Sequence, residues 1–324
     1  MKLLPKFANI AITSNCNSHC LMCDMWKKKT PDTLKPTFYQ KLPPTLTDIT
    51  LTGGEPFLRT DIDKIIKNIK KACPKSKITI NSNGFLTQQI TQKVKTILKK
   101  VPNLSVRISI DGTAKKHNLI RNTPNAYQKA IQTIEQLKKT QLKNLGICFT
   151  LVKDNYQDLN KIFQYSQKQK INFSLIFIDD SSIFFGNNKK RFQKLNPKLI
   201  SEVKKLTSKR LSDNNPKQWF HALFDQWQLN YQQKHTRPFI CDAGTNSFYL
   251  DPKGNIYVCH LKNWKLGNLK KTTFSEIWNT PDKFPVSSCT DCWTMCTAKS
   301  PIKKHICKTI VKTTYLKIQH ESNL

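Results

Sequence analysis

The chain has 324 residues and a net charge of +33, from 54 lysines and arginines against 21 aspartates and glutamates. Its hydrophobic content of 38% excludes intrinsic disorder as the main state, because so much apolar surface needs a folded core. No run of about 18 apolar residues occurs, and Pro5 and Lys6 interrupt the first segment, so we expect neither a membrane-spanning helix nor a signal peptide. The length fits about two domains, or one large α/β barrel with an appendage, in a cytoplasmic protein.

The positive charge is almost entirely lysine, because only six of the 54 basic residues are arginine. Arginine offers the planar fork that suits phosphates and bases, whereas lysine is a flexible, solvated point charge. The lysines are also spread along the whole chain. This pattern favours a bias in composition over a binding surface, and it leaves nucleic acid, an acidic peptide or a membrane surface open as partners.

Short β-like runs alternate with segments of helical periodicity in the first half of the chain. The runs are 8–13, 48–52, 78–81, 105–110, 146–152 and 173–178. Between them, 61–72 and 127–137 place their apolar residues on one helical face. Six units of strand then helix predict a parallel sheet covered by helices, with the chemistry at the carboxyl ends of the strands.

The pattern changes after residue 180. Helices are expected at 197–210 and 216–233, each with a proline in or near its first turn. From Cys241 onward, Cys, Gly, Pro and Trp become frequent, which predicts a second, smaller domain. The predicted parts are 1–180, a helical bridge at 181–238, a Cys-rich α+β domain at 239–310 and a basic tail at 311–324.

Three of the eleven cysteines follow the first predicted strand in a C-x3-C-x2-C run, namely Cys16, Cys20 and Cys23. In a reducing compartment, clustered cysteines indicate metal ligands rather than disulfides. Three thiolates from one loop can hold three irons of a four-iron cluster and leave the fourth iron open to an outside ligand. Zinc is the alternative, but it usually takes four ligands, and His19 is the one candidate inside the loop for a fourth.

This run and its position resemble the radical SAM superfamily, over about residues 5–180. The resemblance implies a partial (β/α)6 barrel, similar to a TIM barrel, and a [4Fe-4S] cluster whose open iron binds S-adenosylmethionine (SAM). In that family, an electron from the reduced cluster cleaves SAM, and the 5′-deoxyadenosyl radical abstracts a substrate hydrogen. Cys16, Cys20 and Cys23 would hold this catalytic cluster, while the protein supplies placement and exclusion of water.

Further motifs match at the ends of the next three strands. By resemblance, the residues that bind the cofactor are Met22, Gly53, Gly54, Glu55, Asn83, Ser109, Asp111 and Arg121. The glycines of the GGE motif would let the backbone approach the methionine part of SAM. Ser109 and Asp111 would approach its ribose and Arg121 its carboxylate, and Met22 replaces an aromatic residue that is common in the family. An ordinary turn or helix cap is the alternative for the polar residues.

A second group of cysteines resembles the auxiliary-cluster region of the SPASM and twitch subgroup. The ligands implied are Cys241, Cys259, Cys289 and Cys292, with Cys296 able to replace either of the last two. One cysteine of the full SPASM pattern is missing, so we expect one auxiliary [4Fe-4S] cluster rather than two. A zinc ribbon is the alternative.

Three other cysteines are expected outside these clusters. Cys307 is left over, and Cys73 and Cys148 are expected to be structural.

These motifs predict a radical SAM enzyme, an oxidoreductase that oxidises or cross-links a peptide or small molecule. A reducing donor such as flavodoxin or ferredoxin is implied. Because the cysteine loop begins at residue 16, a maturase acting on a leader peptide would need a separate peptide-recognition protein. Two alternatives stay open, namely RNA modification, motivated by the charge, and a non-catalytic iron-sulfur protein, against which the intact motifs argue.

Overall fold

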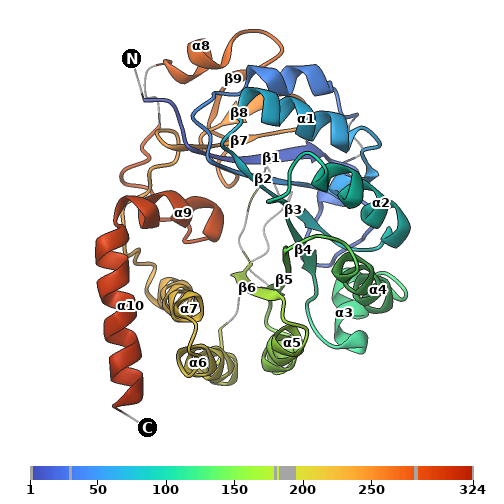
Figure 1. Ribbon diagram of the computed structural model, residues 1–324. Coiled ribbons are helices and arrows are strands. Elements are labelled where there is room, and N and C mark those ends of the chain that lie inside the picture. Colours follow the sequence, from blue (N-terminus) through green and yellow to red (C-terminus); the bar gives the residue numbers. More distant parts are fainter. Residues whose placement is uncertain (1–2, 29–30, 179–180, 182–194, 281–283, 323–324) are drawn as a thin grey trace.

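A nine-stranded sheet organises the chain (Figure 1) in the order β6-β5-β4-β3-β2-β1-β7-β8-β9. The computed structural model describes residues 3–28, 31–178, 181, 195–280 and 284–322. The first six strands are parallel: β1 (Phe7–Thr13), β2 (Asp48–Gly53), β3 (Lys77–Ser82), β4 (Ser105–Ser109), β5 (Asn144–Leu151) and β6 (Asn172–Phe177). The six predicted strands are confirmed, and no end differs from its prediction by more than two residues.

Helices cover the outer side of the curved sheet (Figure 1). They are α1 (Ile62–Ala72), α2 (Thr87–Leu98), α3 (Ala114–Arg121), α4 (Ala126–Lys138) and α5 (Tyr156–Lys168), with short 3-10 turns η1 (Met25–Lys27), η2 (Pro36–Lys41) and η3 (Pro56–Leu58). In α1, Ile62, Ile65, Ile66 and Ile69 form the buried face, as their spacing predicts. Burial of each such side chain stabilises the fold by about 1.5–3 kcal/mol.

The helical bridge consists of α6 (Pro197–Leu211) and α7 (Pro216–Lys234). Each helix begins with an asparagine cap followed by proline. The Asn196 and Asn215 side chains accept hydrogen bonds from backbone N–H groups of the first turn. The segment in which we expect the barrel to end, around residue 180, lies largely outside the described residues.

The C-terminal region extends the barrel sheet instead of forming a sheet of its own. Its elements are β7 (Ser247–Leu250), β8 (Asn255–Tyr257), β9 (Lys265–Asn268), α8 (Phe274–Trp278), α9 (Met295–Lys304) and α10 (Ile306–Glu321). Strand β7 pairs in parallel with β1, with Phe7 opposite Ser247 and Ile10 opposite Leu250. Backbone hydrogen bonds therefore join the predicted second domain directly to the barrel.

The predicted basic tail, 311–324, begins within α10, so the predicted boundary falls inside a helix. A count of charges could not reveal this helix, because it is anchored by two buried threonines, Thr309 and Thr313. Among the described residues, no helix is both long and apolar enough to cross a membrane.

A buried ion pair fixes α6 to α7 beneath the barrel. Arg210 and Asp225 are almost fully buried, with Nε and Oδ2 separated by 2.9 Å. The guanidinium also donates to the Phe173 carbonyl at 3.2 Å and lies over the rings of Phe163 and Phe173. This cation therefore connects the bridge to β6 and α5.

We expect Asp225→Ala to lower the free energy of unfolding by about 3–5 kcal/mol, because it leaves a buried arginine without its counter-ion. The double variant Arg210→Met, Asp225→Leu should lose much less, since neither charge remains. Denaturant titration of the three proteins measures both values. Equal losses in the single and double variants would contradict this account.

Candidate functional site

A cavity of about 220 Å³ opens where the barrel strands end and reaches into the barrel interior. Its strand residues are mostly uncharged and polar, and include Asn9, Thr50, Asn81 and Thr150. All three cysteines of the C-x3-C-x2-C run line this cavity. The structure therefore brings the predicted cysteine loop to the strand ends, where parallel α/β folds place their chemistry.

The two glycines of the GGE motif support the cysteine loop. Gly54 donates a backbone hydrogen bond to Thr13 at 2.9 Å, and the next residue, Glu55, donates one to Asn15 at 2.8 Å. A Cβ atom on Gly53 would collide with the Thr13 carbonyl, and one on Gly54 with the Asn15 carbonyl. Gly53 and Gly54 both line the cavity. A side chain at either position is excluded by the backbone of Thr13 and Asn15, which leads into the cysteine loop.

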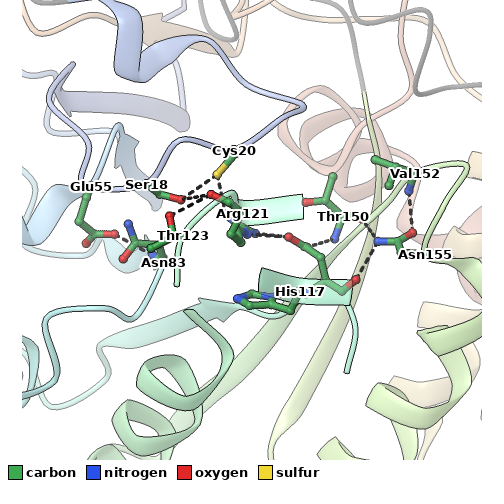
Figure 2. Close-up of polar contacts among 11 residues, drawn as sticks. Ser18, Cys20, Glu55, Asn83, His117, Arg121, Thr123, Thr150, Val152 and Asn155 are labelled. Carbon is green, nitrogen blue, oxygen red and sulfur yellow. Dashed lines mark hydrogen bonds and ion pairs between the residues drawn. The ribbon is translucent and has the colours of Figure 1, made fainter. Parts of the chain in front are cut away.

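Polar groups surround the sulfur of Cys20 (Figure 2). The Ser18 hydroxyl lies 3.0 Å from Sγ, and Nη1 of Arg121 lies 3.7 Å from it. Ser18 also donates to the Arg121 carbonyl at 3.3 Å, which ties the cysteine loop to the end of α3. Because the Ser18 hydroxyl has one hydrogen and donates it to this carbonyl, Arg121 is the donor to the sulfur.

An ion pair with Asp111 orients Arg121, and Asp111 itself does not line the cavity. Its Oδ2 accepts from Nε and pairs with Nη2 of Arg121, both at 2.6 Å, and its Oδ1 accepts from the Thr150 backbone at 2.9 Å. Burial would lower the pKa of Arg121, but Asp111 and Cys20 raise it above its ordinary value. The structure thus places Asp111 behind the arginine, where it orients the guanidinium.

Residues around Asp111 fix its position in the same network, and Figure 2 labels His117, Val152 and Asn155 among them. Its backbone N–H donates to Nδ1 of His117 at 2.9 Å, and its carbonyl accepts from Asn155 at 2.9 Å. Asn155 also accepts from the Val152 backbone at 2.9 Å. The loops after β4 and β5 are therefore locked together behind Arg121.

Glu55 is fully buried and joins the ends of β2 and β3. Its carboxylate accepts from the Asn83 backbone at 2.7 Å, from the Ser82 hydroxyl at 2.9 Å and from the Phe57 backbone at 3.1 Å. Burial raises the pKa of Glu55 to about 7, although these donors favour the ionised form. Glu55 does not line the cavity, and its hydrogen bonds hold the ends of β2 and β3 together.

The other predicted cofactor residues do line the cavity. They are Met22, Asn83 and Ser109, together with Arg121. Met22 packs in a small apolar cluster with Ile120, Val152 and Ile178. The Asn83 side chain donates to Asn17 in the cysteine loop at 2.7 Å and accepts from the Phe85 backbone at 3.0 Å.

A second, smaller cavity gathers the cysteines of the C-terminal region. Cys241, Cys259, Cys289 and Cys292 all line it. Arg237 donates to the Cys289 carbonyl at 2.6 Å and lies 3.6 Å from Sγ of Cys292. This arrangement supplies four thiols and a cation around one space.

Cys296 lies elsewhere, which differs from its expected role as a replacement ligand. It lines the first cavity together with His260, Thr294 and Met295, and its carbonyl accepts from Asn9 of β1 at 3.4 Å. The first turn of α9 therefore turns this cysteine toward the barrel.

Three further cysteines lie outside both thiol groups, and two of them lie where the sequence predicts. Cys73 is buried at the end of α1 and donates to Pro43, as expected for a structural residue, and Cys307 is exposed on α10. Cys148 differs, because its strand turns it into the first cavity. The alternation of β5 was the signal that could have shown this, since Cys148 and Thr150 share one face.

Sequence reasoning missed the residues that the C-terminal region adds to the first cavity. His260 is buried, and burial lowers its pKa to about 4, so it is neutral at pH 7. Nothing in the local sequence marks His260, Thr294 or Met295 as neighbours of the barrel. Their position depends on the pairing of β7 with β1.

The donor chemistry of both cysteine groups fits iron-sulfur clusters. Thiolates of a four-iron cluster are spread around a cube, one on each iron. Among the residues that the structure describes, no three His, Cys, Asp or Glu side chains converge as ligands of a single metal ion. The first group offers three thiols and the second offers four.

Comparison with known families agrees with both groups. The radical SAM superfamily matches residues 10–165, and the iron-sulfur cluster-binding domain called SPASM matches residues 241–293. The chain therefore belongs to the radical SAM superfamily and carries a SPASM domain. Its cofactors are SAM with a [4Fe-4S] cluster, and an auxiliary iron-sulfur cluster.

Curated relatives carry out different reactions. Pre-heme d1 synthase of Dinoroseobacter shibae is 21% identical, over 84% of this chain and 72% of its own length. A probable GTP 3′,8-cyclase of Methanococcus aeolicus is 29% identical, over 53% and 58%. The sporulation killing factor maturation protein SkfB of Bacillus subtilis is 22% identical, over 85% and 65%.

Solved structures share the fold. The enzyme anSMEcpe, with AdoMet and a peptide bound, aligns over 98% of this chain and 99% of its own, with a TM-score of 0.68 and 16% identity. Streptococcus suis SuiB bound to its precursor peptide SuiA aligns over 90% and 67%, with a TM-score of 0.65 and 16% identity. The predicted partial barrel with a C-terminal domain is thereby confirmed.

We expect Glu55→Gln to change how stability depends on pH. With a pKa of about 7 in the folded protein and 4.5 as its ordinary value, Glu55 keeps a proton in this range that the unfolded chain releases. The free energy of unfolding of the natural protein, relative to Glu55→Gln, should therefore fall as pH rises from about 4.5 to 7. Denaturant titrations at several pH values measure this difference, and parallel curves would contradict it.

Proposed function

We propose that this protein is a radical SAM enzyme that abstracts a hydrogen from a polypeptide substrate and oxidises or cross-links it. The observation that carries the proposal is the lining of the first cavity. Of its described side chains, only Arg121 carries a permanent charge, and none is a lysine or a carboxylate. An uncharged side chain of a peptide suits such a space.

The assignment of cofactor residues follows from the cavity. We propose that Cys16, Cys20 and Cys23 hold the [4Fe-4S] cluster, and that Arg121 binds the SAM carboxylate. When reduced, the cluster and SAM supply the 5′-deoxyadenosyl radical that abstracts the hydrogen. Arg121 is suited to a carboxylate because Asp111 fixes its orientation and keeps it charged. A reducing carrier such as flavodoxin or ferredoxin would deliver the electron.

The cavity also weighs against phosphate-bearing substrates. GTP and RNA carry several phosphate charges, which proteins meet with clustered lysines and arginines. The described lining has a single arginine, although the chain as a whole carries 54 basic residues. The similarity to the maturation protein SkfB, and to anSMEcpe and SuiB with their bound peptides, supports the peptide class.

We propose that the four thiols of the second cavity hold one auxiliary [4Fe-4S] cluster. Its ligands would be Cys241, Cys259, Cys289 and Cys292, while Cys296 faces the substrate space. The region around this cluster also contributes His260, Thr294 and Met295 to the first cavity. A substrate held there would lie between the two cysteine groups, where the auxiliary cluster can accept an electron from it.

Replacing Cys16, Cys20 and Cys23 together with Ala should remove about half of the iron, because only one of two four-iron clusters is lost. SAM cleavage should vanish. Iron analysis of anaerobically reconstituted protein and chromatography of 5′-deoxyadenosine test both points. Continued production of 5′-deoxyadenosine by the triple variant would overturn the assignment, and zinc in place of iron would favour the ribbon alternative.

The matched pair Cys259→Ala and Cys296→Ala separates the two cysteine roles. Cys259→Ala should lose auxiliary iron and product formation yet keep SAM cleavage within about tenfold, since this cysteine does not line the first cavity. Cys296→Ala should keep all the iron. Circular dichroism must show that both variants fold, because cluster ligation can contribute to stability. Iron loss in Cys296→Ala would show that it is a ligand after all.

A further inference from the structure

The last helix, α10, exposes its apolar residues and buries its small polar ones. Thr309 and Thr313 are 1% and 8% exposed, and they lie on the side of the helix that packs against α7 and α6. Leu316 packs against the apolar cluster of α7, but the other large apolar residues of α10 are 47–68% exposed, namely Ile306, Ile310, Val311, Tyr315 and Ile318. A surface helix normally does the opposite, because burial of its apolar face is what holds it in place.

Four of these exposed apolar residues form a strip along the helix. With 3.6 residues in each turn, Val311, Tyr315 and Ile318 fall on the side opposite Thr309 and Thr313. Ile310 lies at the edge of that side, and we call these four exposed apolar residues the α10 stripe. Figure 1 shows α10 at the margin of the molecule, with α7 and α9 on its inner side. The stripe is a ridge rather than a groove.

The surroundings of the α10 stripe are strongly basic. Lys304, Lys308 and Lys312 are exposed along the end of α9 and the first half of α10, while Lys303 pairs with Asp48 of β2 at 2.7 Å. The one acidic residue in these two helices is Glu321, and it pairs with Lys317 at 2.8 Å. Whatever covers the stripe must therefore tolerate or favour several positive charges.

We propose that the α10 stripe docks this protein on an anionic lipid membrane. Apolar side chains on a ridge can enter the boundary between headgroups and acyl chains, while the flanking lysines attract anionic headgroups. Tyrosine, as at Tyr315, suits that boundary because it has an apolar ring and a polar tip. The helix would lie along the surface and would not cross it.

Charge argues against a second copy of the chain as the occupant. Pairing two stripes would bring Lys304, Lys308 and Lys312 of each copy together, on molecules that each carry a net charge of +33. A convex ridge also lacks the groove into which a peptide helix would fit. An extended anionic surface satisfies both the shape and the charge.

Vesicle co-sedimentation of the complete protein tests the proposal. We expect binding to phosphatidylcholine vesicles with about 30% phosphatidylglycerol, and little binding to phosphatidylcholine alone. The double variant Val311→Ser, Ile318→Ser should reduce partitioning at least about tenfold, since two apolar side chains no longer enter the lipid. The matched control Leu3→Ser, Leu119→Ser removes exposed leucines elsewhere and should bind as the natural protein does.

A second pair of variants tests the charge. Lys308→Glu with Lys312→Glu should abolish binding, whereas Lys67→Glu with Lys71→Glu, on exposed positions of α1, changes the net charge equally and should have little effect. Equal losses in both pairs would show diffuse attraction only and would overturn the proposal.

Two further outcomes would also overturn it. One is failure of the natural protein to bind anionic vesicles. The other is a dimer, seen by light scattering, that the stripe variant separates, because a second copy would then cover the stripe. Circular dichroism checks the fold of each variant. The proposal does not rest on the proposed reaction, because vesicle binding is measured without SAM or substrate.

Discussion

Close contact between two backbone segments sets the geometry on which the site depends. The end of β2 lies so close to Thr13 and Asn15 that only glycine fits at Gly53 and Gly54. This contact fixes where the cysteine loop leaves β1. Glu55 extends the same constraint to β3, because its buried carboxylate collects donors from Ser82 and Asn83. The GGE motif thus orders three consecutive strand ends.

Each cysteine group has one arginine within reach of a sulfur. Arg121 lies 3.7 Å from Cys20 and Arg237 lies 3.6 Å from Cys292. The two arginines differ in their other partners, and they therefore differ in what they can bind. Arg121 is held by a carboxylate and opens on the cavity, so it can serve a ligand. Arg237 donates to the carbonyls of Cys289 and Cys292, so it orders the loop that carries two thiols.

Local patterns predicted the strands and helices, because hydrophobic periods of 2 and 3.6 residues lie within short stretches of sequence. The cysteine groups were predicted from the spacing of neighbouring cysteines. These local patterns could not predict the union of the two regions into one sheet, since the pairing of β1 with β7 joins residues about 240 positions apart. The same limit explains Cys296. Its spacing resembles that of a ligand, but the direction of α9 turns it toward the barrel. Glu55 and Asp111 belong to motifs that the sequence shows, but their burial behind the cavity depends on tertiary packing.

The distribution of charge separates the interior of the site from the surface of the molecule. The described cavity lining contains one arginine, whereas exposed lysines cover the outer helices. A substrate that needed many cations would find them outside the barrel and not next to the cysteine loop. The lysine excess therefore lies on the outer surface, and the described cavity lining carries one positively charged side chain, Arg121. On α10, exposed lysines lie beside exposed apolar residues. A partner that covers this helix must therefore match both the positive charge and the apolar surface.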